Sequence, residues 1–246
     1  MQHEEYARMY ALEDHYWWFV ARRQLAIGLL DRYVANRKPR ILDLGCGTGV
    51  VLSELKKRGE AIGFDFSEEA LNFCQKRGLD GLVRGNGEKL PFQEESFDAI
   101  VGLDIFEHIE DDHAAFQEAF RILAPNGKLI LSVPAFMSLW GPHDVALMHF
   151  RRYTRPDLKR KLESSGFRLE KSSYSICLLF PLVALIRFFE KRKTGEAAAS
   201  LPSVPVWLNK SLIGLQSFER ALMAAISLPF GSSVVVVATK PSKTEV

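Results

Sequence analysis

Short apolar runs alternate with amphipathic stretches through the middle of the chain. The apolar runs have the length and β-branched content of buried strands, and they cover residues 40–45, 61–66, 81–86, 97–104 and 128–135. Helical periodicity lies between them, most clearly at 50–59 and 113–127. Strands and helices that alternate at this spacing are typical of βαβ units. The pattern therefore predicts an α/β fold with a doubly wound, mainly parallel sheet.

The flanking segments complete this picture. Two further strands at 167–176 and 232–240 bring the predicted sheet to seven strands. Helices are predicted at 3–14, 16–35 and 206–228, and residues 195–205 have the composition of a linker. We predict one domain over 1–246, and we divide it into an N-terminal helical cap (1–35), a core (40–135), a substrate-side segment with a helical insertion (136–230) and a terminal strand (231–240).

Composition and charge fit one large α/β domain. The chain has 246 residues, of which 47% are hydrophobic and 25% charged. A formal net charge of +2 gives no general attraction to nucleic acid, so no nucleic-acid partner is predicted. The three cysteines, Cys46, Cys74 and Cys177, are scattered and form no C-x-x-C pair. This usage indicates reduced thiols and no thiolate zinc site.

The chain shows no targeting or membrane-spanning pattern. Its first residues, MQHEEYARMY, are acidic where a signal peptide would be basic. The longest apolar run, 176–186, is shorter than the roughly 20 residues that span a bilayer. We therefore predict a cytoplasmic protein.

A glycine-rich turn follows the first predicted strand, in the segment ILDLGCGTG at 41–49. Glycines between a strand and a helix allow the backbone to approach a ligand closely. Val50 stands where a dinucleotide fingerprint has its third glycine, and Asp43 would repel a diphosphate but attract a cation. No Gly-Lys-Ser/Thr follows, which excludes a P-loop.

LDLGCGTG resembles motif I of the class I S-adenosylmethionine-dependent methyltransferases. Asp65 stands where these enzymes hold the ribose hydroxyls, and residues 85–92 resemble their GDAExLPF stretch, with Asn86 in place of the aspartate near the adenine. Residues 97–111 and 121–134 resemble two later motifs. The resemblance covers about 40–135 and implies the Rossmann-like methyltransferase fold with S-adenosyl-L-methionine as cofactor.

The resemblance also implies which residues bind the cofactor. They are Trp17, Asp43, Gly45, Cys46, Gly47, Gly49, Asp65, Phe66, Asn86, Gly87, Glu88, Leu103 and His108. For Trp17 and Trp18 two roles stay open, because aromatic side chains pack in cores and also attract a sulfonium cation. Arg22 or Arg23 could meet the methionine carboxylate or simply lie on a solvated helix face.

Two segments outside these motifs resemble one subgroup of these methyltransferases. LEDHYWWFVARR (12–23) and WGPHDVALMHFRRYTRPDL (140–158) look like one subgroup of bacterial and archaeal methyltransferases. That subgroup resembles the ubiquinone-biosynthesis O-methyltransferases. Asp104, Glu107 and His108 resemble the E-x-x-E-H pattern of metal-using members, and carboxylates with an imidazole suit a divalent ion. The same pattern lines the cofactor pocket in metal-independent relatives, and we predict no metal.

The segment after the fifth predicted strand carries candidate acceptor-side chemistry. Ligands of doubly wound sheets bind at the carboxyl ends of the strands. A histidine there can accept a proton, and Arg151 or Arg152 could hold a carboxylate or phosphate. The predicted catalytic residues are His143, Asp144, His149 and Tyr153. The alternative is a structural lid that these side chains only fix in place.

The predicted reaction is in-line transfer of a methyl group, with O-methylation of a small-molecule or lipid-linked acceptor favoured. The alternatives are a non-catalytic S-adenosylmethionine-binding module, an NAD-dependent oxidoreductase and an RNA methyltransferase. Val50 and Asp43 argue against the oxidoreductase, and the near-neutral charge and the lack of an N-P-P-Y-type motif argue against RNA.

The insertion at 177–230 is strongly apolar for a connecting segment, and Lys191, Arg192 and Lys193 follow its first apolar stretch. Such a helix can lie in a membrane interface, so peripheral membrane contact is one candidate role. Packing on the core or in a homodimer interface is the other. Apolar side chains run nearly all round this helix, which favours burial within protein.

Overall fold

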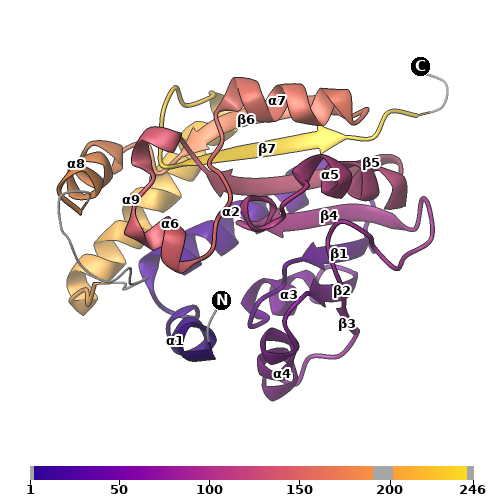
Figure 1. Ribbon diagram of the computed structural model, residues 1–246, viewed down its shortest axis with the longest axis horizontal. Coiled ribbons are helices and arrows are strands. Elements are labelled where there is room, and N and C mark those ends of the chain that lie inside the picture. Colours follow the sequence, from indigo (N-terminus) through magenta and orange to yellow (C-terminus); the bar gives the residue numbers. More distant parts are fainter. Residues whose placement is uncertain (1–2, 191–201, 243–246) are drawn as a thin grey trace.

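A seven-stranded sheet forms the centre of the computed structural model, which describes residues 3–190 and 202–242 (Figure 1). The strands are β1 (Arg40–Leu44), β2 (Glu60–Asp65), β3 (Leu82–Arg84), β4 (Phe97–Leu103), β5 (Leu123–Pro134), β6 (Arg168–Ser175) and β7 (Ser233–Thr239). Their order is β3-β2-β1-β4-β5-β7-β6. The first five are parallel, and β7 runs antiparallel to both β5 and β6. The predicted doubly wound, mainly parallel sheet is confirmed.

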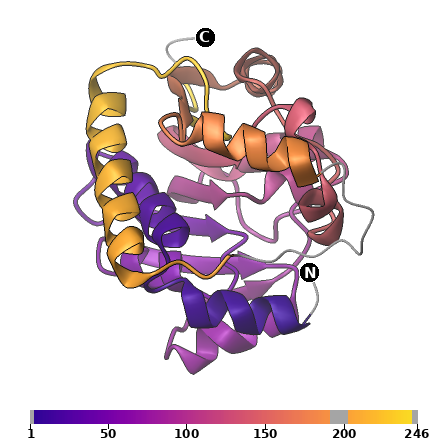
Figure 2. The same cartoon turned by 90° about the vertical axis from the view of Figure 1, so that its left-hand side faces the viewer.

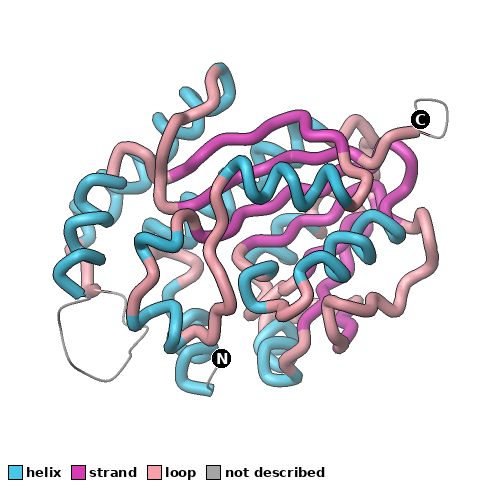
Figure 3. Tube along the Cα trace, turned by 45° about the horizontal axis from the view of Figure 1, so that its top comes forward, coloured by secondary structure: helices cyan, strands magenta, loops and turns pink. Residues whose placement is uncertain are grey.

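Helices cover both faces of this sheet (Figure 3). They are α1 (His3–Leu12), α2 (Trp17–Tyr33), α3 (Val50–Leu55), α4 (Glu68–Lys76), α5 (Asp112–Ile122), α6 (Pro142–Ala146), α7 (Arg155–Ser164), α8 (Phe180–Glu190) and α9 (Val206–Ala225), with short 3-10 turns η1 (Phe106–His108) and η2 (Met137–Leu139). Successive strand residues point to opposite faces. Accordingly Leu42 packs in the core with α5 and α7, while Ile41 packs in the core with α2 and α3.

The helices α4 and α7 begin at the capping residues that the sequence predicts. Ser67 accepts a hydrogen bond from Ala70 N at the start of α4, and Thr154 accepts one from Asp157 N at the start of α7. One predicted boundary is wrong. The helix predicted at 113–127 ends at Ile122, because Leu123 is fully buried and pairs with Phe97 as the first residue of β5.

Helix α8 is not packed into the core of its own chain, which was one of the two protein environments predicted for the apolar insertion, and burial in a homodimer interface stays a prediction. Leu185, Phe188 and Phe189 are 53%, 51% and 53% exposed, and Figure 2 shows α8 (orange) on the outer surface of the molecule. The apolar pattern indicates that burial would be favourable for both sides of the helix. It does not identify the surface that covers the outer side. Among the helices of residues 3–190 and 202–242, none combines the length and hydropathy needed to cross a bilayer. The basic Lys191–Lys193 and most of the predicted linker fall outside the described residues.

Candidate active site

A cavity of about 1650 Å³ lies at the carboxyl ends of β1, β2 and β4, which is where a doubly wound sheet binds its ligands. The N-terminal helices α1 and α2 form one wall, and η1, α6 and α8 form the other walls. Small-molecule sites usually measure about 300–1000 Å³. The cavity therefore has room for a cofactor and a second ligand.

Most of the predicted cofactor residues line this cavity. These are Trp17, Asp43, Gly45, Cys46, Gly47, Asp65, Phe66, Asn86, Gly87, Glu88, Leu103 and His108. Gly49 does not line it. Its left-handed backbone (φ 90°) starts α3, and it packs beside Cys74 and Leu79, behind the turn. Its predicted direct contact with the cofactor is therefore not supported by its position.

The glycine turn is tied to the neighbouring strand. Gly47 N donates to the Oδ2 atom of Asp65 at 3.0 Å, and Asp65 also accepts from Ser67 N at 2.9 Å. Gly45 N and Cys46 N both donate to the carbonyl of Phe64. Asp65 thus lies at the end of β2 with its carboxylate against the turn, in the place where a ligand's polar groups would meet it.

Asp43 is a buried carboxyl group in the cavity wall. Its Oδ2 atom has no hydrogen-bond partner among the described residues, and its side chain is almost fully buried. Burial raises the pKa of Asp43 to about 8, the charge of Asp65 adds to the rise, and Arg22 opposes it. A buried acceptor without a partner fits a cationic or N–H-bearing ligand, and S-adenosylmethionine carries both an ammonium and a sulfonium group.

We expect Asp43→Asn to stabilise the ligand-free protein in a pH-dependent way. Since the folded-state pKa is above the usual value, the parent protein loses stability as the pH rises from about 4 to about 8. The variant lacks this loss, so its Tm should match the parent near pH 4 and exceed it by about 5 °C at pH 8. Thermal unfolding across this range measures the difference.

The matched control is Asp80→Asn, which removes an exposed carboxylate whose pKa is lowered by Lys56. It should bring no gain at any pH. A Tm difference between Asp43→Asn and the parent that does not change with pH would contradict the buried, protonated state of Asp43.

The first helix pair closes over the turn through charged contacts. Arg22 of α2 donates to Asp104 at the end of β4, and its guanidinium lies 4.7 Å from the ring centre of Trp18. Arg23 instead donates to the Glu13 carbonyl at 2.9 Å. Asp104 has a left-handed backbone (φ 52°), which is uncommon for aspartate and concentrates at functional sites. The two arginines therefore hold the cap in place over the cavity.

Sequence reasoning missed one part of this closure. Glu13 follows α1, is buried, and accepts hydrogen bonds from the Thr48 hydroxyl in the glycine turn and from Arg77 at 2.6 Å. Arg77 also donates to the Thr48 carbonyl at 2.9 Å. No local pattern distinguishes Glu13 from the other acidic residues of the N-terminal segment. Only the three-dimensional structure brings these three residues together.

The loop after β3 has its polar groups engaged locally. Glu88 N donates to the Asn86 side-chain oxygen at 3.0 Å, and Glu88 in turn accepts from Asp111 N at 3.2 Å. Phe66 is 73% exposed on the facing side of the cavity. Asn86 thus shapes the loop with the oxygen that an aspartate would use, while Phe66 offers an open aromatic surface.

His149 is held by a buried ion pair. Asp144 accepts from His149 Nδ1 at 3.0 Å, from Arg152 Nε at 2.7 Å and from Gly141 N at 2.9 Å. Burial alone would raise the pKa of Asp144, but the hydrogen bonds from His149 and Arg152 outweigh it and hold the pKa well below its usual value. Because a carboxylate only accepts, Nδ1 carries the proton and Nε2 of His149 is left to accept.

Burial lowers the pKa of the other two cavity histidines, His143 and His108. Burial and the nearby positive charge of Arg187 lower the pKa of His143 to about 4. Burial and His149 lower the pKa of His108 to about 3. Both rings are therefore neutral near pH 7, and His149 differs from them in having a carboxylate partner.

Glu107 lies beside these histidines. Its carboxyl oxygens are fully buried without a hydrogen-bond partner among the described residues, and burial together with the charge of Asp104 raises its pKa well above the usual value. Donor atoms of Glu107, His108 and His149 lie within 4.8 Å of one another. This grouping replaces Asp104 of the sequence pattern with His149, since Asp104 pairs with Arg22. The absence of a metal remains a prediction.

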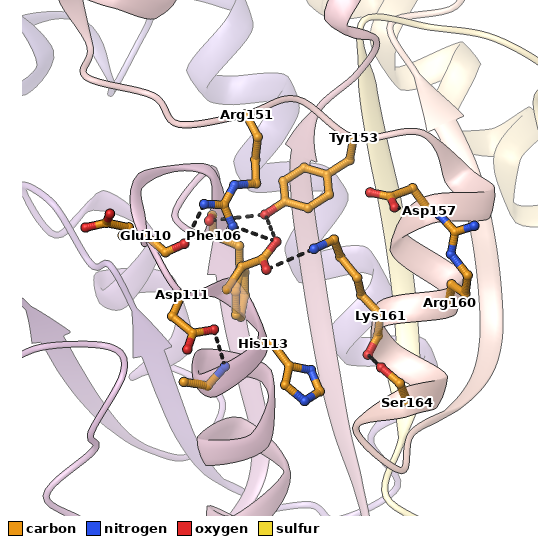
Figure 4. Close-up of polar contacts among 12 residues, drawn as sticks. Phe106, Glu110, Asp111, His113, Arg151, Tyr153, Asp157, Arg160, Lys161 and Ser164 are labelled. Atoms are coloured by element: carbon orange, nitrogen blue, oxygen red, sulfur yellow. Dashed lines mark hydrogen bonds and ion pairs between the residues drawn. The ribbon is translucent and has the colours of Figure 1, made fainter.

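Two predicted catalytic residues do not face the cavity. Asp144 is fully buried behind His149, where it positions the ring. Tyr153 is buried on the far side of the segment, and its hydroxyl donates to Asp112 at 2.8 Å. Arg151 and Lys161 also bind Asp112, at 3.0 Å each, and Figure 4 shows their side chains converging on that of Tyr153. Burial raises the pKa of Tyr153 far above its usual value. The position of Tyr153 therefore does not support the predicted catalytic role.

The fold and the cavity define a Rossmann-like domain whose glycine turn, acidic strand ends and cap fit an adenosyl cofactor with a positive charge. Residues 42–131 match the methyltransferase domain family. A probable S-adenosylmethionine-dependent methyltransferase of Mycolicibacterium smegmatis is 29% identical over 164 residues, which is 64% of this chain and 62% of the relative. The ubiquinone biosynthesis O-methyltransferase of Pseudomonas fluorescens is 27% identical over 150 residues, 54% of this chain and 63% of the relative.

A solved structure shows the same fold. A methyltransferase of Haloferax volcanii, solved with the Trm112 methyltransferase activator, has a TM-score of 0.63 at 20% identity and covers 97% of this chain and 95% of its own. The chain spans just under two thirds of the length of the two curated relatives. Residues 42–131 thus carry a methyltransferase domain, and the chain is similar to S-adenosylmethionine-dependent methyltransferases, as the resemblance implies, whose cofactor is S-adenosylmethionine.

Proposed function

We propose that the protein transfers a methyl group from S-adenosylmethionine to an oxygen of a small-molecule or lipid-linked acceptor. The observation that carries this proposal is that one cavity joins the glycine turn at Gly45 and Gly47 to His149, whose ring is oriented by Asp144. A non-catalytic binding module would not need an oriented base on the acceptor side.

When bound, S-adenosylmethionine supplies a methyl group already activated by its sulfonium. The protein's task is then to align the acceptor, exclude water and remove a proton from its hydroxyl. His149 accepts that proton at Nε2, and Asp144 stabilises the resulting imidazolium through Nδ1. Arg152 keeps Asp144 ionised for this purpose. Burial raises the pKa of Glu107, which disfavours a negative charge on this carboxyl group next to His149.

The acceptor class follows from the walls of the second half of the cavity. Leu179, just before α8, and Leu182, Val183 and Ile186 of α8 line it, and Arg187 is the one charged residue that α8 adds to this wall. Such walls suit a hydrocarbon portion, while His149 and His143 lie near the polar end. The relative from Pseudomonas fluorescens is named for ubiquinone biosynthesis, and a phenolic hydroxyl with an apolar tail would fit this division. No nucleic-acid partner is proposed, since the chain's net charge is only +2.

We expect His149→Gln to lower kcat/KM by about 100-fold or more, because a positioned general base contributes that much. Phenols with and without a prenyl tail serve as acceptors, and release of S-adenosylhomocysteine reports turnover. Since the base acts in the chemical step, the loss should fall on kcat while cofactor affinity stays unchanged.

The matched control is His113→Gln, an exposed histidine on α5 that contacts Gln117 and lies outside the cavity. It should keep the parent's activity. If His149→Gln stays within about threefold of the parent, general-base catalysis at this position is wrong, and the cavity's role is reduced to alignment.

A further inference from the structure

Helix α8 has apolar side chains on both of its sides. Val183 lines the cavity together with Leu179 just before the helix, whereas Leu185 and Phe189 are about half exposed at 53% each on the outside. The helix lies at the edge of the molecule in Figure 1 and across its outer surface in Figure 2. A helix that is apolar all round is normally enclosed. Here one side is enclosed by the cavity and the other side meets the exterior.

The cavity reaches the exterior along this helix. Leu182 and Ile186 both line the cavity and are exposed, at 55% and 47%. Met137 of the neighbouring η2 turn, which contacts α8, is 53% exposed and extends the apolar surface. Apolar side chains of α8 thus connect this surface with the half of the cavity that holds His149, and Arg187 is the one charged side chain of α8 that lines the cavity.

The charge of the segment identifies what lies outside. Between 176 and 189 the single charged residue is Arg187, and the sequence continues through Glu190 to Lys191, Arg192 and Lys193. A symmetric dimer through α8 would bring the same basic sequence of two chains together, with one glutamate each to offset it. Anionic lipid headgroups attract such a segment, by about 1 kcal/mol for each basic residue near the surface.

We infer that α8 docks on an anionic phospholipid surface, inserting Leu185 and Phe189 into the interfacial region, so that a membrane-resident acceptor enters the cavity along the helix. The α8 helix has 11 residues, fewer than the roughly 20 that span a bilayer, so it would lie in the plane of the interface. The docking surface consists of Leu182, Leu185, Ile186 and Phe189. This inference rests on the proposed function for the acceptor's route, and the docking itself is tested separately.

The test is flotation of the full chain with vesicles of phosphatidylglycerol and phosphatidylcholine, compared with vesicles of phosphatidylcholine alone. The parent should float with the anionic vesicles at low salt, and its affinity should fall about tenfold in high salt or on neutral vesicles. The variant Leu185→Ser/Phe189→Ser should lose about tenfold or more on anionic vesicles. The control Phe218→Ser, an apolar residue of α9 that is 58% exposed, should bind as the parent does.

Thermal unfolding and S-adenosylhomocysteine binding establish that each variant is folded. If the parent stays unbound with anionic vesicles at low salt, the inference is overturned. It is also overturned if sedimentation shows a dimer that Leu185→Ser/Phe189→Ser converts to a monomer while vesicles have no effect, since α8 would then face a second copy. Turnover of a water-soluble phenol without vesicles reports on the proposed function alone, so its failure is distinguishable from failure of docking.

Discussion

Arg152→Met is expected to lower the free energy of unfolding by about 3–5 kcal/mol, the usual cost of removing one partner from a buried ion pair. Arg152 and Asp144 are 6% and 0% exposed at the side chain, and the guanidinium binds both carboxylate oxygens, at 2.7 and 3.0 Å. Its third hydrogen bond goes to the Ala135 carbonyl at 3.1 Å. Methionine fills much of the volume but leaves Asp144 ionised and buried with too few donors.

Chemical denaturation of the parent and the variant measures this change. The control is Arg160→Met, which removes an arginine that is 78% exposed from its pair with Asp157 and should cost less than about 1 kcal/mol. The double variant Asp144→Leu/Arg152→Met should recover part of the loss, because no unpaired charge remains. A loss below about 1 kcal/mol for Arg152→Met alone would mean that water reaches Asp144.

The same ion pair joins stability to the proposed chemistry. Asp144 can orient His149 only while it remains ionised, and Arg152 is the charge that keeps it so. Arg152 also connects the segment after β5 to the sheet through Ala135. The residues that position the proposed base are therefore residues that the fold itself requires, which explains why an ion pair is retained in a place where burial is costly.

The sheet was predictable because each of its strands leaves a local signal. Buried parallel strands are short apolar runs, and the segments at 40–45 and 97–104 are bounded by glycine or acidic residues that mark their ends. The boundary at Leu123 was not predictable. Leu123 continues the helical pattern of α5, and only its pairing with Phe97 in the sheet decides that it begins β5.

The cofactor half of the site was predictable from motif order, whereas the acceptor half was not. The sequence places His143, Asp144, His149 and Tyr153 in one segment. It does not show which of these side chains form hydrogen bonds or ion pairs with other residues of the protein. Asp144 is bound by Arg152, and Tyr153 by the distant Asp112. Asp144 and Tyr153 point away from the cavity because they bind these partners. The spacing of residues along the sequence does not predict such contacts.

Helix α8 shows a similar limit. An apolar pattern on all sides of a helix indicates that the helix is buried away from water. A protein core, a second subunit or a lipid surface can each provide that environment. The position of the helix in the fold excludes the core of its own chain and leaves the other two. Leu185 and Phe189 are exposed because α8 packs against the cavity and the η2 turn at the edge of the molecule.

Gly45→Ala is expected to weaken the binding of S-adenosylhomocysteine by about 100-fold. Gly45 has a left-handed backbone (φ 75°), and a Cβ atom there would lie 2.7 Å from Cγ1 of Ile105, well inside van der Waals contact. Gly45 and Ile105 both line the cavity, and Gly45 N is hydrogen-bonded to the Phe64 carbonyl. The turn must therefore move, and the backbone that approaches the ligand moves with it.

Gly78→Ala provides the matched control, because Gly78 has nearly the same backbone conformation (φ 76°) but nothing lies within 4 Å of a Cβ atom placed on it. Both substitutions impose the left-handed strain of about 1–2 kcal/mol, and Gly45→Ala should lower the Tm further because its Cβ atom also meets Ile105. Only Gly45→Ala should change the affinity measured by titration calorimetry. If the two variants bind S-adenosylhomocysteine within about threefold of each other, the turn at Gly45 does not hold the cofactor, and the assignment of this end of the cavity to the adenosyl ligand is wrong.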